Sequence, residues 1–129
     1  MTTAKELAET SLRLTKAKDR DGWLALFASD AVVEDPVGGK PHRGIEAITD
    51  FVDFTISTVE SFDYEIERSY LCGNEVAMVI RFNIVAAGTK LDMDVVNVYA
   101  TDGNGKLTSL RSFWDGSRQG HATGHEVDE

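Results

Sequence analysis

The segment that decides the fold is Val32-Val33-Glu34-Asp35-Pro36-Val37-Gly38-Gly39, in which an apolar strand runs into a proline-glycine turn. The side chain of Asp35 stands at the end of that strand. Hydrophobic neighbours keep water away from a carboxylate in such a place, and desolvation raises its proton affinity. A carboxylate of this kind suits the removal of a proton from carbon. The alternative interpretation is a plain strand end, because Asp and Pro are ordinary turn residues.

The composition is that of an ordinary globular protein. With 129 residues, the chain suits one domain that buries roughly two-thirds of its unfolded surface. The net charge of −9 argues against nucleic acid or an anionic membrane as a partner. No apolar run has the length of a membrane span, and the polar N-terminus does not read as a signal peptide. The single cysteine, Cys72, excludes an internal disulfide and favours a reducing cytoplasm; we expect it to be buried packing.

A helical pattern opens the chain. Thr3 and Glu6 have the spacing of a capping box, which predicts a helix that begins near residue 4. Leu7, Ser11 and Leu14 then fall on one face at helical spacing. Ser11 is therefore a polar residue on an otherwise apolar stripe.

Two further helices are expected in the first half. Asp21 can cap a short helix over residues 23–28. A short strand over 31–35 and a loop over 38–44 come next. The third helix is expected over 45–59, and its apolar side chains recur at helical spacing. The predicted buried stripe of this helix is Ile48, Phe51, Val52, Thr55, Ile56 and Val59.

From Phe62 onward the apolar period switches to two, which is typical of strands. Asp102-Gly103-Asn104-Gly105 is a strong hairpin turn. Three helices followed by an antiparallel meander make an α+β fold, and a long curved sheet over helices encloses a pocket. In the first strand, Tyr64, Ile66, Tyr70 and Cys72 are expected to share one face. The expected strands cover residues 62–72, 75–87, 90–101 and 106–115. The tail over 116–129 is expected to be loose or draped on a partner.

A close resemblance to the ketosteroid isomerases is carried by the stretch Asp21-Gly22-Trp23-Leu24-Ala25-Leu26-Phe27-Ala28-Ser29-Asp30-Ala31-Val32-Val33-Glu34-Asp35-Pro36-Val37-Gly38. The likeness continues through Gly44-Ile45-Glu46-Ala47-Ile48 and Asp102-Gly103-Asn104-Gly105-Lys106 to Ser112-Phe113-Trp114, so it covers nearly the whole chain. These enzymes share a cone-shaped fold with nuclear transport factor 2 and the SnoaL-like polyketide cyclases. The resemblance implies a single domain over residues 1–129, with three N-terminal helices packed in a strongly curved, mostly antiparallel sheet.

The resemblance also implies a role for Asp35 as general base. In the family this carboxylate removes a proton alpha to the 3-keto group of a steroid and returns it to the far end of the dienolate. A tyrosine on the first helix and a neutral aspartic acid on the fifth strand stabilise the oxyanion. Alignment without gaps places Ser11 and Asn97 at those two positions, and Val52 at a third family tyrosine. Because losing one oxyanion donor costs roughly a hundred- to a thousandfold in rate, we expect any isomerase activity to be slow.

Asn97 and Tyr99 are the candidates for replacement donors. Asn97 alternates with Val95 and Tyr99 on one strand face, and its amide can still donate one hydrogen bond to an enolate oxygen. Tyr99 is the favoured substitute among the three tyrosines, and Ser11 could act through a bound water. The alternative for Asn97 is a hydrogen-bonded amide in the core.

The remaining pocket wall is expected to be apolar, with plain core packing as the open alternative. The spacing of His42, His121 and His125 does not suit a metal site, so no metal and no cofactor is expected. The resemblance implies a homodimer through the outer face of the sheet, where Asp92 and Asp94 lie either at that interface or in solvent. The expected pocket-lining residues are Phe51, Val52, Ile80, Phe82, Ile84, Leu110, Ser112 and Trp114.

The function expected from these features is proton-transfer isomerisation of a flat hydrophobic ketone, such as a steroid or polyketide. Asp35 would be the base and Asn97 the donor. Two alternatives stay open. One is another enzyme of this fold, such as a cyclase that uses Asp35 in an intramolecular aldol step. The other is a non-catalytic protein that binds a steroid or another lipophilic ligand.

Overall fold

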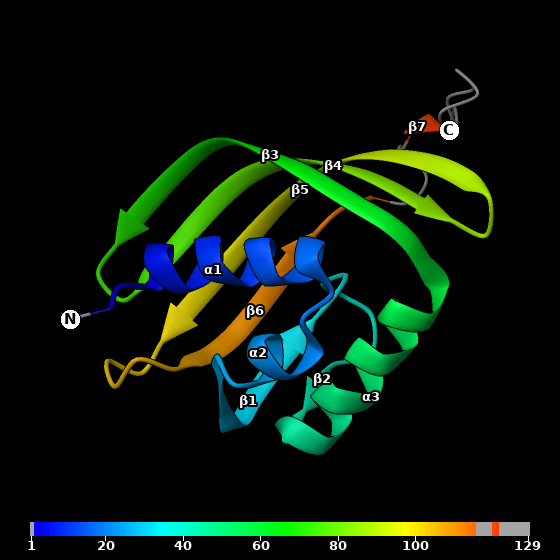
Figure 1. The fold of residues 1–129 in the computed structure, drawn as a ribbon. Coiled ribbons are helices and arrows are strands. Elements are labelled where there is room, and N and C mark those ends of the chain that lie inside the picture. Colours follow the sequence, from blue (N-terminus) through cyan, green and yellow to red (C-terminus); the bar gives the residue numbers. More distant parts are fainter. Residues whose placement is uncertain (1, 116–119, 122–129) are drawn as a thin grey trace.

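The computed structural model describes residues 2–115 together with 120 and 121. A curved sheet folds over the first helix, and the two further helices lie below the first helix in the view of Figure 1. The α+β class and the curved sheet predicted from the sequence are confirmed. The elements are α1 Ala4–Ala17, α2 Arg20–Leu24, β1 Phe27–Glu34, β2 His42–Arg43, α3 Gly44–Thr58, β3 Val59–Cys72, β4 Glu75–Ala86, β5 Thr89–Thr101, β6 Leu107–Phe113 and β7 Gly120–His121.

The sheet follows the order β2-β1-β6-β5-β4-β3, with β7 paired to β5. The pairs β3–β4, β4–β5 and β5–β6 are antiparallel, whereas β1 and β6 are parallel. The parallel pair sets Val33 beside Leu110 and Glu34 beside Arg111. This register brings the residue after β1, Asp35, to the strand that carries Ser112.

The first helix begins as the capping box predicts. The Thr3 hydroxyl accepts from the Glu6 amide at 3.2 Å, and the Glu6 carboxylate accepts from the Thr3 amide at 2.8 Å. Two orphan amides at the helix start are thereby satisfied. Leu7 and Ser11 are buried on the face that contacts β3, β4 and β5. The helix ends at Lys18 in the left-handed conformation.

The second helix and the first strand begin earlier than predicted. The N-cap of α2 is Asp19 rather than Asp21, and its carboxylate accepts from the Gly22 amide at 2.9 Å. The first strand begins at Phe27 rather than at residue 31 because Phe27 pairs with Leu107 of β6. In the expected loop over residues 38–44, the chain forms β2, which pairs with Val32 and Val33 of β1.

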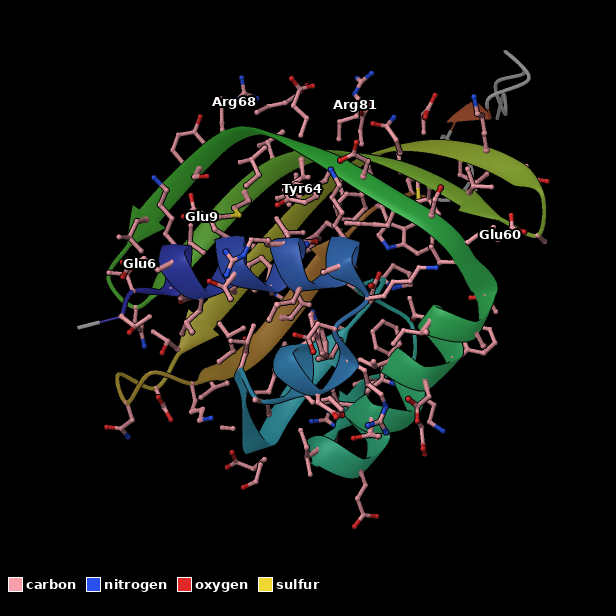
Figure 2. All side chains as sticks on the ribbon, viewed as in Figure 1. Glu6, Glu9, Glu60, Tyr64, Arg68 and Arg81 are labelled. Carbon is pink, nitrogen blue, oxygen red and sulfur yellow. The ribbon has the colours of Figure 1, made fainter. Side chains whose placement is uncertain are left out.

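The facing of β3 changes partway along the strand. Tyr64 lies on the side of β3 that faces α1, whereas Arg68 and Arg81 extend away from the helix (Figure 2). A register shift between Ile66 and Arg68 interrupts the alternation of side chains. The prediction that Tyr70 and Cys72 share a face with Tyr64 and Ile66 is therefore wrong. Tyr70 is 54% exposed, and Cys72 is exposed rather than buried.

Most of the tail over 116–129 lies outside the described residues. Gly120 and His121 are described, and they pair as β7 with Asp92 and Leu91 of β5. None of the described helices has the length and apolar character needed to cross a membrane. The homodimer through the outer sheet face stays a prediction; two apolar side chains, Val96 and Phe113, are exposed there as a cross-strand pair.

Candidate functional site

An apolar cavity of about 170 Å³ lies between the helices and the curved sheet. Apolar side chains from α3 and from the sheet form most of its wall. Lys18 and Arg20 lie at its exposed edge, where Arg20 pairs with Asp53 at 2.6 Å. The apolar wall includes Phe51, Val52, Phe62, Phe82, Ile84 and Leu110, and the polar side chains at its inner end are Ser11, Asp35, Asn97, Tyr99 and Ser112.

The carboxylate of Asp35 enters the cavity because β1 ends there. Side chains alternate along a strand; Glu34, the preceding residue, pairs with Arg111 at 3.0 Å, and Asp35 turns to the cavity. The Val37 amide donates to the Ser112 carbonyl at 2.9 Å, which fixes the turn against β6.

The surroundings of Asp35 raise the pKa of its carboxyl group. Burial raises the pKa of Asp35, because desolvation penalises the charged carboxylate. The Trp114 indole donates to Oδ1 of Asp35 at 2.6 Å, and this hydrogen bond opposes the rise in pKa. The charge of His42 and a hydrogen bond from Ser112 oppose it further. The balance is a carboxyl group with a raised pKa that is nevertheless held in one orientation.

A chain of hydrogen bonds joins β5 to α1 at the inner end. Nδ2 of Asn97 donates to the Tyr99 hydroxyl at 3.1 Å. The Ser11 hydroxyl lies 2.7 Å from the Ala8 carbonyl oxygen and 3.3 Å from the Tyr99 hydroxyl. Ser11 has one proton, and the carbonyl can only accept, so that proton belongs to the shorter contact. The Tyr99 proton is then free to go to Ser11 or to a ligand.

Tyr99 keeps its proton at neutral pH. Burial raises the pKa of its phenol, and the nearby charge of Asp35 adds to the rise, against the hydrogen bonds with Ser11 and Asn97. A protonated phenol beside a carboxylate base provides a hydrogen-bond donor and a proton acceptor in one apolar cavity.

Asn97 has a different partner from the one expected. Its amide nitrogen contacts Tyr99, and its Oδ1 is buried with no hydrogen-bond partner among the residues that the structure describes. Tyr99 and Asn97 both line the cavity, and the Asn97 amide donates to the Tyr99 hydroxyl.

The cavity gathers most of the side chains singled out from the sequence. Asp35, Asn97, Ser11 and Tyr99 all lie in its wall. Ile80 does not: it is only 1% exposed and belongs to the hydrophobic core. The predicted lining residues that do line the cavity are Phe51, Val52, Phe82, Ile84, Leu110 and Ser112.

Trp114 and the other tyrosines also lie elsewhere. Trp114 is absent from the cavity wall and acts instead on Asp35. Tyr64 and Tyr70, the alternative donors, do not line the cavity.

Sequence reasoning missed two contributions to the site. His42 stacks on Phe51 with 4.6 Å between ring centroids, and its charge acts on Asp35. The stripe on α3 was predicted as buried, but Ile56 is 36% exposed and lines the cavity with Thr55. The sequence did hold a signal for this part of the cavity, because the apolar stripe of α3 continues beyond the residues that pack in the core. Within the described part of the chain, no three His, Cys, Asp or Glu side chains cluster as metal ligands would.

In this α+β fold a curved sheet encloses an apolar cavity that has one carboxyl group at its inner end. Such an arrangement defines a small-ligand site of the cone-shaped class. Residues 8–110 match the family of SnoaL-like domains, and the chain belongs to that family. A steroid Δ-isomerase of Nocardioides simplex is 31% identical over 90 residues, which cover 70% of this chain and 72% of the relative.

Two solved structures support the same assignment. The Δ5-3-ketosteroid isomerase of a Mycobacterium species is similar with a TM-score of 0.85 and 26% identity, over 95% of this chain and 100% of that one. A Mycobacterium tuberculosis protein in complex with estradiol-17β-hemisuccinate is similar with a TM-score of 0.84 and 26% identity, over 93% of this chain and 99% of that one. The resemblance to the ketosteroid isomerases and the fold that it implied are confirmed.

Proposed function

We propose that this protein isomerises a flat, hydrophobic β,γ-unsaturated ketone by moving a proton, with Asp35 as the base. The observation that carries the proposal is the desolvated Asp35 carboxyl, held by Trp114 at 2.6 Å in the wall of an apolar cavity. The isomerase relatives and the steroid in the neighbouring complex support a substrate of steroid-like shape.

The proposed reaction has two proton transfers. The Asp35 carboxylate takes a proton from the carbon between the carbonyl and the double bond, and the electron pair of that C–H bond moves to the carbonyl oxygen. The protonated Asp35 then returns the proton to the far end of the dienolate, and the double bond moves into conjugation. A base whose pKa is raised toward the working pH is suited to both steps.

Tyr99 is the proposed donor to the developing oxyanion. Its hydroxyl accepts from Asn97, which leaves its own proton for the ligand and makes that proton a better donor. One phenol replaces the two donors of the family, and Asn97 acts through Tyr99. Because each oxyanion donor is worth roughly a hundred- to a thousandfold in rate, the reaction is expected to be slow.

The proposal is tested by following the absorbance of a conjugated enone with a β,γ-unsaturated 3-ketosteroid as substrate. Asp35→Asn removes the base without changing its shape, so the rate should fall by about a hundredfold or more. Glu34→Gln is the matched control, because Glu34 is the adjacent carboxylate and pairs with Arg111 away from the cavity. Equal rates for the wild type and Asp35→Asn contradict the proposal.

Binding without turnover is the second candidate function. The unpartnered Oδ1 of Asn97 favours it, because an acceptor stands where the family places a donor. In that case a steroid binds to the wild type and to Asp35→Asn alike, and neither protein forms the enone.

A further inference from the structure

One buried atom at the inner end of the cavity lacks a partner. Asn97 is 4% exposed and lines the cavity, and its Oδ1 makes no hydrogen bond within the described residues. Native structures rarely leave a buried acceptor unpaired, because its lost hydration is not regained. An unpaired acceptor in a ligand cavity is open to a donor group of the ligand.

The nitrogen of the Asn97 amide faces Tyr99 in this structure. Its nitrogen donates to the Tyr99 hydroxyl at 3.1 Å, so its oxygen is the atom left over. The Ser11 proton goes to the Ala8 carbonyl at 2.7 Å, so Ser11 does not satisfy Tyr99 as a donor. Beside Asp35 and Ser112, the inner end therefore offers one unpaired acceptor, Oδ1 of Asn97, and two donors, the Tyr99 hydroxyl and the second N–H of the Asn97 amide.

We propose that the inner end of the cavity recognises a hydroxyl group of the ligand, which donates to Oδ1 of Asn97. A hydroxyl both donates and accepts, so it can satisfy Oδ1 of Asn97 whether the Tyr99 proton goes to that hydroxyl or to a neighbouring carbonyl oxygen. A ketone oxygen can only accept; it could take protons from Tyr99 and from the Asn97 amide nitrogen, but it would leave Oδ1 of Asn97 unpaired. Combined with the proposed isomerisation, on which this step rests, the substrate is a ketone with a hydroxyl next to its carbonyl, or the enol of a 1,3-dicarbonyl compound.

The test compares two flat ligands of nearly equal size, 2-naphthol and 2-fluoronaphthalene, of which only the first has a hydroxyl. Kd is measured by the fluorescence of 2-naphthol and by competition. The wild type should prefer 2-naphthol by about 10- to 100-fold, the range expected when a buried group is left without its partner. Asn97→Leu, which is nearly isosteric and has no acceptor, should lower that ratio by about tenfold.

Asn97→Val gives a second variant whose branched side chain suits a strand, in case the leucine variant does not fold. Glu34→Gln is the matched control and should keep the wild-type ratio, because Glu34 pairs with Arg111 away from the cavity. The proposal is wrong if the wild type shows no preference, if neither compound binds, or if the ratio survives in the Asn97 variants. It is also wrong if Asp35→Asn alone removes the ratio, because the hydroxyl then donates to Asp35.

The outcome is separate from that of the isomerase assay. A protein that prefers 2-naphthol but forms no enone disproves the proposed isomerisation and supports hydroxyl recognition. A protein that forms the enone but shows no preference supports the proposed isomerisation and disproves hydroxyl recognition.

Discussion

The hydroxyl groups of Ser11 on α1 and Tyr99 on β5 lie 3.3 Å apart at the inner end of the cavity. The resemblance to the ketosteroid isomerases aligns Ser11 with a tyrosine of the first helix, and in this chain a phenol from the fifth strand contacts Ser11. Both side chains are about 1% exposed, and no further atom fits between their two hydroxyl groups.

A phenol at position 11 should therefore clash with the phenol of Tyr99. Ser11→Tyr adds a ring to a filled site, and overpacking of this kind costs about 1–3 kcal/mol. Tyr99→Phe removes the hydroxyl that the new ring meets, so the double variant should recover much of the lost stability. Urea unfolding of the two single variants and the double variant measures this coupling. Additive changes in the free energy of unfolding would show that the two sites do not share space.

Tyr99 should be the main donor to the oxyanion. Tyr99→Phe keeps the ring and removes the proton, so the isomerisation rate should fall by roughly a hundred- to a thousandfold. Ser11→Ala is the matched control, since it removes the other hydroxyl of the pair and should change the rate far less. The reverse order of effects would assign the donor role to Ser11.

Trp114 should lower the pKa of the proposed base, Asp35. Its indole donates to the Asp35 carboxylate and so opposes the rise in the pKa of that group. Trp114→Phe should raise the pKa of Asp35 further. The pH at which isomerisation reaches half its maximum should move upward, because the base must be deprotonated. An unchanged pH profile of kcat/KM would show that the hydrogen bond does not affect the base.

Ionisation of Asp35 should destabilise the fold. Burial raises the folded pKa of Asp35 above 3.8, its ordinary value, so the native state binds more protons than the unfolded state between these two values. The contribution of Asp35 to the free energy of unfolding is therefore lost as the pH rises through the folded pKa. Asp35→Asn cannot ionise and should be more stable than the wild type at neutral pH.

Thermal melts across a range of pH measure that difference. The advantage of Asp35→Asn should shrink as the pH falls toward 3.8, where the wild-type carboxyl regains its proton. A variant that is less stable than the wild type at neutral pH would mean that the charged carboxylate is well satisfied.

Much of the fold could be predicted because the patterns that determine it lie among neighbouring residues in the sequence. The capping box at Thr3 places the start of α1, and alternation predicts β4 and β5 to within one residue. The errors arise where distant segments decide. Phe27 lies in a strand because it pairs with Leu107 of β6. The register shift after Ile66 changes which side chains at the end of β3 face inward.

The candidate site shows the same division. Asp35 could be placed in a cavity from its own neighbours and from the resemblance. The hydrogen bond from Trp114 to Asp35 joins residues 79 positions apart, and the orientation of the Asn97 amide depends on Tyr99. No local pattern encodes which amide atom a neighbouring hydroxyl will bind.

The most direct test of the central claim is a titration of the Asp35 side chain by carbon-13 NMR, assigned by comparison with Asp35→Asn. A carboxyl group that is shielded from water should lose its proton at a pH clearly above 3.8. A midpoint at or below that value would mean that Asp35 is hydrated or fully paired, and the proposed base would be lost.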